Sequence, residues 1–327
     1  MSLSFLKDKT VLITGAAGYI AANLSPRLEA AAWMILRLDR PGAAFPPSSG
    51  RAAVRDIAGD IRDCDLWDEL VREVDVIFHF AAQTSVYAAE QDPAADLQIN
   101  FLPVTSILEA CRRHGRTPVF LYAGTVTQVG VTTTVPVNED VPDCPITVYD
   151  LHKLLAEQYL QYYTRQGIVR AAVLRLANVY GPGPKSGSAD RGVLNAMIRR
   201  ALNGETLTVY GEGNYLRDYV YIDDVVRAFT AAAANIDAIA GRHFVIGSGR
   251  GHTFAAAMQT IAARVFHHTG RRVEVVSVAP PARLSPIEFR QFVADSGRFR
   301  QLTGWRAQWH LSDGIDATIK DFLHRRD

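Results

Sequence analysis

Short apolar runs alternate with longer stretches of helical periodicity over the first half of the chain. Each apolar run is nearly uninterrupted, which is typical of parallel strands that helices cover on both faces. The predicted strands are Thr10–Thr14, Trp33–Asp39, Asp75–Phe80, Val119–Tyr122 and Ala171–Leu176, and the predicted helices are Ala17–Ala30, Asp63–Arg72, Pro93–His114 and Ile146–Gln166. This alternation predicts an α/β fold with a doubly wound parallel sheet.

The second half of the chain has a different pattern. A Gly- and Pro-rich loop over Gly181–Gly192 precedes a predicted helix, Val193–Asn203, and a short strand, Thr206–Tyr210. A turn follows at Gly211–Asn214, and His243–Ile246 is predicted to be one more core strand. We therefore expect a nucleotide-binding lobe of residues 1–180 with about 220–246. Residues 181–219 and 247–327 would form a smaller mixed α/β lobe.

Composition narrows the class of protein. Of the 327 residues, 48% are hydrophobic, which is enough for a large core. The formal net charge of +1 argues against a nucleic-acid partner, because neutralising phosphates needs a basic excess. No apolar run is long enough to span a membrane, and the N-terminus lacks a secretory signal. Cys64, Cys111 and Cys144 form no metal-binding spacing, so we expect a cytoplasmic protein without a metal.

A glycine turn follows the first predicted strand directly. Gly15 and Gly18 would let the backbone approach a pyrophosphate, whose charge the start of the next helix would stabilise. Ala21 occupies the place of a third glycine, where a small residue is sufficient. The cofactor-binding candidates here are Gly15, Ala17, Gly18, Tyr19 and Ile20.

Asp39 closes the second strand and suits a carboxylate that binds the ribose hydroxyls of NAD. The same charge would repel the 2′-phosphate of NADP. Arg40 leaves NADP open, because a neighbouring arginine can accommodate that phosphate. A strand-end Asp that caps the next turn is the simpler alternative. We expect NAD, with NADP as the less favoured cofactor.

Two further strand ends carry cofactor candidates. Asp60 and Ile61 could hold the adenine, whereas Asp63 beside them suits a helix N-cap. Ala81 and Ala82 are small enough for backbone to lie against a cofactor. His79 has apolar neighbours, which favours a packed core histidine over a ligand.

Tyr149 and Lys153 lie four residues apart in a predicted helix, so both side chains share one face. A nearby ammonium stabilises a phenolate and lowers the pKa of a tyrosine from its ordinary value of about 10. The pair could then act as general acid and base. A plain surface helix is the alternative for this spacing. Thr125, just after the predicted strand Val119–Tyr122, could bind the reacting oxygen, or could bond only its own backbone.

The motifs together resemble the extended short-chain dehydrogenase/reductase family, in its NAD-dependent nucleotide-sugar epimerase/dehydratase branch. The resemblance covers nearly the whole chain and rests on Thr14–Ala21, Asp60–Asp63, His79–Gln83, Thr125–Gly130, Tyr149–Lys153, Arg175–Gly183 and Arg217–Asp224. It implies a Rossmann lobe for NAD, a C-terminal lobe for a nucleotide-diphosphate sugar, and a catalytic triad at Thr125, Tyr149 and Lys153.

The resemblance also implies roles for residues that the spacing does not assign. Asn178 matches an Asn near the substrate phosphates, and Arg217 matches an Arg that pairs with the diphosphate. The alternative for Arg217 is a salt bridge with Asp218 or Asp223. Gln83 and Ser85 match the loop that borders the sugar, and Asn100 matches an Asn on the cofactor side. A second substrate arginine is left open between Arg283 and Arg290.

Several positions depart from the family pattern. Ala123 and Gly124 stand where serines usually precede the catalytic hydroxyl, and Val129 and Ala177 replace aromatic residues. Val126 and Thr127 stand where the 4,6-dehydratases carry an Asp-Glu pair, so a dehydratase is disfavoured.

The leading hypothesis is a nucleotide-sugar epimerase that acts at C4 through a 4-keto intermediate, with Tyr149 as acid and base. A reductase of a nucleotide-linked 4-keto-6-deoxy sugar, using NAD(P)H, is the closest alternative. A non-catalytic nucleotide-binding scaffold is the remote one, since a fold does not fix function. The predicted helices carry aromatic and apolar residues on more than one face, such as Leu160, Tyr162 and Tyr163. The resemblance implies that these helices pair across a two-fold axis, so we expect a homodimer; the alternative is that these residues only cover the sheet.

Overall fold

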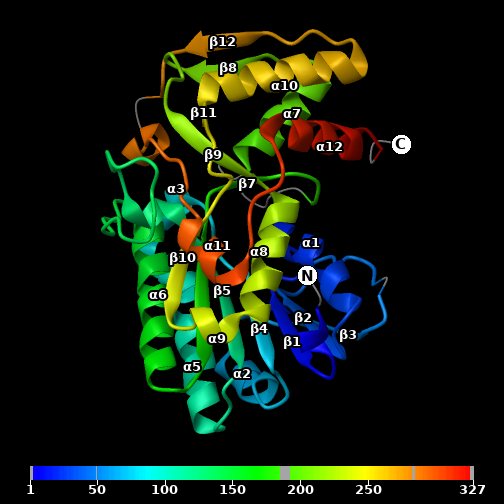
Figure 1. Ribbon diagram of the computed structural model, residues 1–327, viewed down its shortest axis with the longest axis vertical. Helices are drawn as coiled ribbons and strands as arrows, with labels where there is room; N and C mark the ends of the chain where they lie inside the picture. The colour runs from blue at the N-terminus through cyan, green and yellow to red at the C-terminus, as the bar shows by residue number, and fades with distance from the viewer. Residues whose placement is uncertain (1–2, 49, 185–191, 282–283, 325–327) are drawn as a thin grey trace.

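A seven-stranded parallel sheet lies at the centre of the molecule (Figure 1). The structure is a computed structural model that describes residues 3–48, 50–184, 192–281 and 284–324. The strands of this sheet are β1 (Thr10–Thr14), β2 (Met34–Asp39), β3 (Ala53–Ala58), β4 (Val76–His79), β5 (Val119–Thr125), β6 (Arg170–Leu176) and β10 (Arg242–Ile246). Their order is β3-β2-β1-β4-β5-β6-β10, so the chain starts in the middle and winds outward both ways. The predicted doubly wound α/β fold is confirmed.

Side chains alternate between the two faces of the sheet, and each face has its own layer of helices. In β1, Leu12 packs toward one face, whereas Val11 and Ile13 pack toward the other. The first face is covered by α2 (Cys64–Leu70), α5 (Leu102–Arg113) and α6 (Val148–Arg165). The second is covered by α1 (Tyr19–Glu29) and α8 (Ile222–Ala234). These buried faces explain why the strands read as continuous apolar runs.

The smaller part of the molecule is built on two short sheets. β7 (Asn178–Tyr180), β9 (Leu216–Tyr221) and β11 (Gly251–Thr253) form one sheet, and β8 (Leu207–Tyr210) pairs with β12 (Val275–Val278) in the other. The helices α7 (Val193–Asn203), α10 (Phe254–Thr269) and α12 (Leu311–His324) pack around them. One apolar core continues from the large sheet into this part.

One predicted helix is divided in two. Residues expected to form a single helix over Pro93–His114 form α4 (Pro93–Asn100) and α5, with Phe101 between them. Phe101 leaves the helical region, with φ at −121°, and Pro103 supplies no N–H to a preceding turn. The prediction of one helix was therefore wrong at Phe101. The remaining elements are α3 (Val86–Gln91), α9 (Ile236–Ile239), α11 (Gly297–Thr303), and the 3₁₀ turns η1 (Ser4–Leu6), η2 (Val126–Val129) and η3 (Pro286–Phe289).

Other boundaries bear on the candidate site. β5 runs three residues beyond its predicted end and places Thr125 at the end of the strand. The helix predicted over Val193–Asn203 has those bounds. Residues 185–191 of the predicted loop and Arg283 lie outside the described residues. Across the described ranges, no helix is both long and apolar enough to cross a bilayer. The lobe boundaries stay a prediction.

Candidate active site

The glycine turn after β1 is pressed against the loop that follows β4. Gly15 has φ at +65°, and a Cβ there would lie 2.8 Å from the backbone nitrogen of Ala81. A Cβ on Gly18 would lie 2.8 Å from the carbonyl oxygen of Gly15. Only glycine fits these approaches, and α1 begins one residue later with its first N–H groups lacking intrahelical acceptors. This cradle fits the phosphates of a dinucleotide.

Thr14 joins the ends of β1 and β4 below that cradle. Its Oγ1 accepts the N–H groups of Phe80 and Ala81 at 3.2 and 3.1 Å. The same oxygen lies 3.0 Å from Nδ1 of His79. Because both lone pairs of this oxygen already accept N–H groups, its proton is donated to Nδ1 of a neutral His79. The hydrogen bond from the Ala81 N–H to Thr14 thus holds the Ala81 backbone against Gly15.

His79 is buried and neutral, as a packed core histidine should be. It stacks on Tyr122, with ring centroids 5.8 Å apart. Burial, and then the nearby Lys153 ammonium, lower the pKa of His79 to about 3. Nζ of Lys153 lies 3.9 Å from the centroid of the Tyr122 ring, a cation–π contact. Lys153 therefore lies over the Tyr122 ring, and the neutral His79 stacked on that ring adds no second positive charge.

The three predicted catalytic residues come from two elements that touch. Tyr149 and Lys153 lie one turn apart on α6, and both are buried. Lys153 lies over Tyr122, three residues before Thr125 in β5. Thr127, just beyond Thr125, donates to the carboxylate of Asp150, the neighbour of Tyr149. The structure thus packs α6, which carries Tyr149 and Lys153, against the end of β5, which carries Thr125.

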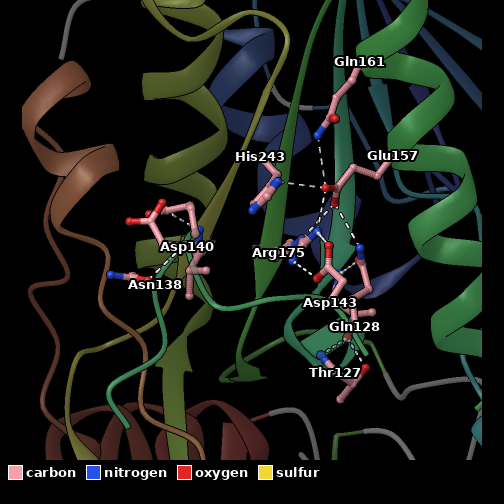
Figure 2. A network of polar contacts seen from close by, with 12 residues as sticks. Thr127, Gln128, Asn138, Asp140, Asp143, Glu157, Gln161, Arg175 and His243 are labelled. Atoms are coloured by element: carbon pink, nitrogen blue, oxygen red, sulfur yellow. Dashed lines mark hydrogen bonds and ion pairs between the residues drawn. The ribbon is translucent and has the colours of Figure 1, made fainter. Parts of the chain in front are cut away.

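A network of mostly buried ion pairs and hydrogen bonds joins Gln128, Glu157 and Arg175 (Figure 2). The backbone N–H of Thr125 donates to Gln128 at 3.2 Å, and Nε2 of Gln128 donates to Glu157 at 3.1 Å. Arg175 donates to Glu157 at 2.7 Å and to Asp143 at 2.6 Å. Burial raises the pKa of Glu157, but hydrogen bonds from His243 and Arg175 outweigh it and lower that pKa to about 2. The carboxylate is therefore charged at neutral pH.

Asp39 borders the glycine turn from the end of β2. Its carboxylate accepts the backbone N–H of Ala17 at 2.9 Å and that of Arg40 at 2.8 Å. This place at the turn suits a ribose acceptor, and the two bonds also give it the capping role weighed from sequence. A turn that allows close approach of a pyrophosphate, with a carboxylate beside it, fits NAD.

Asp60 and Ile61 have local partners. Asp60 forms a two-pronged pair with Arg62, whose hydrogen bonds lower the pKa of that carboxyl. The carbonyl of Ile61 accepts from the indole of Trp67 at 2.8 Å. Asp63 caps α2 by accepting from Asp65, as predicted. An adenine contact at Asp60 and Ile61 stays a prediction.

Gln83, Ser85 and Asn100 are brought together around buried Asp96. Gln83 donates to Asp96 at 2.7 Å, and Asn100 donates to Asp96 at 2.8 Å and to the Gln83 carbonyl at 2.9 Å. Ser85 caps α3 by accepting from Ala88. Within the described residues, Oδ1 of Asn100 is buried without a hydrogen-bond partner. An unmet acceptor among the predicted cofactor residues suits a ligand that donates, and the roles of these residues stay predictions.

Tyr19 lies at the start of α1, but its hydroxyl donates elsewhere. It bonds the carbonyl of Gly181 at 2.9 Å, and Asn23 bonds the carbonyl of Pro182 at 3.1 Å. A Cβ on Gly183 would lie 2.8 Å from the Tyr19 ring. The side chain of Tyr19 thus joins the cofactor side to the loop after β7.

Two arginines meet near Asn178. Arg217 is buried, and its guanidinium donates to the carbonyls of Leu216, Arg290 and Glu288. Burial lowers the pKa of Arg217. Arg290 donates to Asn178 Oδ1 at 3.4 Å. Asp218 instead accepts a hydrogen bond from Ser248 at 2.6 Å. Backbone carbonyls, and not the salt bridge considered from the sequence, therefore hold Arg217 in place.

Some residues of this site escaped sequence reasoning. Arg290 could not be chosen over Arg283 by spacing, and the side-chain contact with Asn178 now favours it. Tyr122 read as an apolar strand residue, although it lies beneath Lys153. Asp150 was not singled out from the sequence, although it is buried against Thr127. A charged residue inside the Tyr-x-x-x-Lys spacing was the available signal for Asp150.

Enzymes that bind a dinucleotide hold the cofactor phosphates at such a glycine turn and carry their catalytic residues at the carboxyl ends of the strands. The fold and the site define this class of protein. Residues 11–247 match the NAD dependent epimerase/dehydratase family. The chain belongs to this family and is an NAD-dependent enzyme.

Similar proteins span almost the whole chain. UDP-glucose 4-epimerase of Mycolicibacterium smegmatis is 31% identical, covering 96% of this chain and 98% of that protein. GDP-6-deoxy-D-mannose reductase of Pseudomonas aeruginosa is 29% identical over 96% of this chain and 97% of its own length. The UDP-glucose 4-epimerase of Thermotoga maritima, solved with UDP-glucose, aligns with a TM-score of 0.86 and 28% identity, covering 97% of this chain and all (100%) of that one.

Proposed function

We propose that the protein is an NAD-dependent nucleotide-sugar epimerase that acts at C4 of the sugar. The observation that carries this proposal is the junction of α6 with the Thr125 turn. There α6, with buried Tyr149 and Lys153, packs against the end of β5 that carries Thr125, at the sheet edge that also carries the glycine turn. An acid–base pair next to a dinucleotide cradle suits reversible oxidation of a sugar hydroxyl.

Each side chain has a role in that chemistry. Bound NAD supplies the acceptor and the donor of hydride. Tyr149 takes the proton of the C4 hydroxyl and returns it after the 4-keto sugar has turned in the site. The Lys153 ammonium supports negative charge on the Tyr149 oxygen, because opposite charges attract strongly where water is excluded. Gly15, Gly18 and the start of α1 would hold the cofactor phosphates, and Asp39 the ribose.

The smaller lobe would hold the nucleotide diphosphate. Arg217 and Arg290 come from β9 and the end of η3, and Asn178 lies beside Arg290. Guanidinium groups match phosphate oxygens in geometry and charge. The guanidinium of Arg217 now donates its hydrogen bonds to backbone carbonyls, and a bound diphosphate would offer it charged acceptors.

A 4-ketoreductase is the second candidate function. Ala123 and Gly124 replace the serines of the family pattern before Thr125, and a GDP-6-deoxy-D-mannose reductase is among the relatives. Reduction would use the same three side chains once and would consume external NAD(P)H.

Turnover of UDP-, dTDP- and GDP-sugars without added cofactor, followed by NMR of the products, tests the epimerase. We expect a C4 epimer from one of them, and Tyr149→Phe should reduce turnover by at least about 10²-fold while NAD affinity changes little. Stoichiometric NAD(P)H consumption with a 4-keto sugar, and no epimer, would establish the reductase instead. An active Tyr149→Phe protein would contradict both.

We further propose a cytoplasmic homodimer. Leu151, Tyr159 and Tyr162 are exposed on α6, which lies beside α5 along one side of the molecule (Figure 1). Such a face suits helix pairing between two copies. Cys64, Cys111 and Cys144 are free thiols, as a reducing compartment keeps them.

A further inference from the structure

One aromatic ring, that of Tyr122, is close to both members of the proposed acid–base pair. Nζ of Lys153 lies 3.9 Å from the centroid of this ring, and the Lys153 side chain is buried. Tyr149 acts on the same group, because burial and then the charge of an ionised Tyr149 raise the pKa of the Tyr122 hydroxyl. Tyr149 and Lys153, one turn apart on α6, are thus both near Tyr122.

The Tyr122 ring is held by its own contacts. It stacks on His79, with ring centroids 5.8 Å apart and 17° between the ring planes. The Tyr122 hydroxyl donates to the backbone carbonyl of Asn100 at 3.4 Å. Tyr122 is also buried, so water does not compete with the ammonium for the ring face. The ring therefore offers Lys153 a fixed surface.

A buried ammonium gains from such a surface. Burial disfavours the charged form of a lysine, and the negative face of an aromatic ring offsets part of that cost. The effect is larger in a site without water than on an exposed surface. His79, stacked on the ring, does not compete with Lys153, because burial and then the Lys153 ammonium lower the pKa of His79 to about 3.

The carboxyl groups around this part of α6 accept hydrogen bonds from other residues. They and their donors are Asp96 of α4 with His152, Glu157 of α6 with Arg175 of β6, Asp150 of α6 with Thr147, and Glu90 of α3 with the backbone of Val148. A substitution of Tyr122 leaves the partners of these groups unchanged. Its effect on Lys153 can therefore be measured on its own.

We propose that Tyr122 is a positioning residue whose ring face keeps the Lys153 ammonium charged and in place to support the Tyr149 oxygen. This inference rests on the proposed function, in which Tyr149 exchanges a proton with the sugar. Without the ring, buried Lys153 would lose its charge more readily or turn away, and Tyr149 would ionise only at a higher pH. A purely structural role for Tyr122 predicts lower stability and no change in the ionisation of Tyr149.

Four variants separate the ring face from its bulk. Tyr122→Leu removes the ring, and Tyr122→Phe keeps it without the hydroxyl. Phe120→Leu removes another buried ring of β5 from the same core and is the matched control for lost packing. Replacing Tyr122 with 3,4,5-trifluorophenylalanine keeps the shape but withdraws negative charge from the ring face, so it tests the inference even if Tyr122→Leu fails to fold. Thermal unfolding shows which variants fold.

Ultraviolet absorbance of tyrosinate measures the ionisation of Tyr149, as the difference between each NAD-saturated protein and the same protein carrying Tyr149→Phe. Tyr122 does not contribute, because its pKa lies well above the ordinary value. Tyr122→Leu and the fluorinated ring should raise the pKa of Tyr149 by about one pH unit or more. In both, kcat for C4 epimerisation should fall about tenfold at about pH 7 and recover at higher pH. Tyr122→Phe and Phe120→Leu should titrate as the parent does.

An unchanged Tyr149 titration with the fluorinated ring would contradict the inference, and so would an equal shift in Phe120→Leu or in Tyr122→Phe. These absorbance measurements need no sugar substrate. Failure of every nucleotide sugar to turn over, together with the expected Tyr149 titration, would instead overturn the proposed function and leave the contact between ring and ammonium established. The two failures are therefore distinguishable.

Discussion

Gly15 and Gly42 have similar backbones but different surroundings. Their φ angles are +65° and +83°, where an L side chain is strained. No described atom lies within 4 Å of a Cβ added to Gly42, whereas one at Gly15 would meet the Ala81 backbone at 2.8 Å. The two positions therefore separate the cost of conformation from the cost of crowding.

We expect Gly42→Ala to lower the free energy of unfolding by about 1 kcal/mol, and Gly15→Ala by about 2–3 kcal/mol, because Ala81 must also move. Gly15→Ala should also weaken NAD binding by about tenfold or more. Denaturant unfolding and NAD titration measure both. Equal effects of the two variants would show that the Gly15 turn is not closely packed.

His79 gives the protein a pH-dependent stability. With a pKa of about 3 in the fold and an ordinary value of 6.5, the unfolded chain binds a proton between these values that the folded chain does not. The resulting stability is present above 6.5 and is lost as the pH falls toward 3.

His79→Phe keeps the stacking and removes this titration. Between about pH 7.5 and about pH 5.5, the parent should lose about 1.4 kcal/mol more unfolding free energy than the variant. The variant also loses the hydrogen bond between Thr14 and His79. This loss lowers the free energy of unfolding equally at both pH values, and the difference between the two proteins at about pH 7.5 measures it. Parallel curves for the two proteins would contradict a neutral buried His79.

The sequence was sufficient for the parts of the candidate site that depend on neighbours along the chain. The glycine turn, Asp39 at a strand end and the Tyr149–Lys153 spacing each depend on local geometry. Arg290, Tyr122 and the Thr127–Asp150 contact depend on distant segments meeting. No period or spacing encodes such meetings, so the structure was needed for them.

At the scale of elements, a buried ion pair joins α6 to β6. Glu157 of α6 accepts two hydrogen bonds from Arg175 of β6, at 2.9 and 2.7 Å. Both side chains are buried, whereas the pair between Arg55 and Glu73 is about half exposed on each side. Removing one buried partner leaves an uncompensated charge.

Glu157→Gln should lower the free energy of unfolding by about 3 kcal/mol, and the control Glu73→Gln by about 0–1 kcal/mol. Because Glu157 also holds Gln128, the variant should lower kcat more than it raises KM. Urea unfolding and steady-state kinetics give both quantities. A Glu157→Gln protein as stable as Glu73→Gln would show that the network is dispensable.

Element boundaries were less predictable than element types. The apolar runs identified the central strands because both of their faces are buried. The break at Phe101 was missed because the helical periodicity continues through it, and only the backbone angle shows the interruption. The extension of β5 to Thr125 was missed because Ala123 and Gly124 resemble a turn.

At the scale of the whole molecule, an apolar stripe remains on the outer helices. Leu151, Leu155, Tyr159 and Tyr162 follow one another at helical spacing along α6, and Leu151 and Tyr162 are each 52% exposed. Trp33, which directly precedes β2, is 67% exposed. A stripe favours a partner surface more than one isolated residue does.

We expect the parent to sediment at about twice the chain mass of 35.9 kDa. Leu151→Arg with Tyr162→Arg should sediment at the mass of one chain, because buried arginines without partners oppose association. Trp33→Arg should keep the parent's mass. A monomeric parent, or a dimer that survives the double substitution, would rule out this interface.

Gly181 also limits how the protein could be re-engineered. Its carbonyl accepts hydrogen bonds from Tyr19 of α1 and from Asn195 of α7 at 2.9 Å each. The helix next to the cofactor cradle and the first helix of the smaller lobe thus share one backbone oxygen. A chimera that grafted a relative's substrate lobe at residue 181 would have to carry matching residues at 19 and 23 as well. The transplantable unit is therefore larger than the lobe itself and includes part of the helix that begins the dinucleotide half.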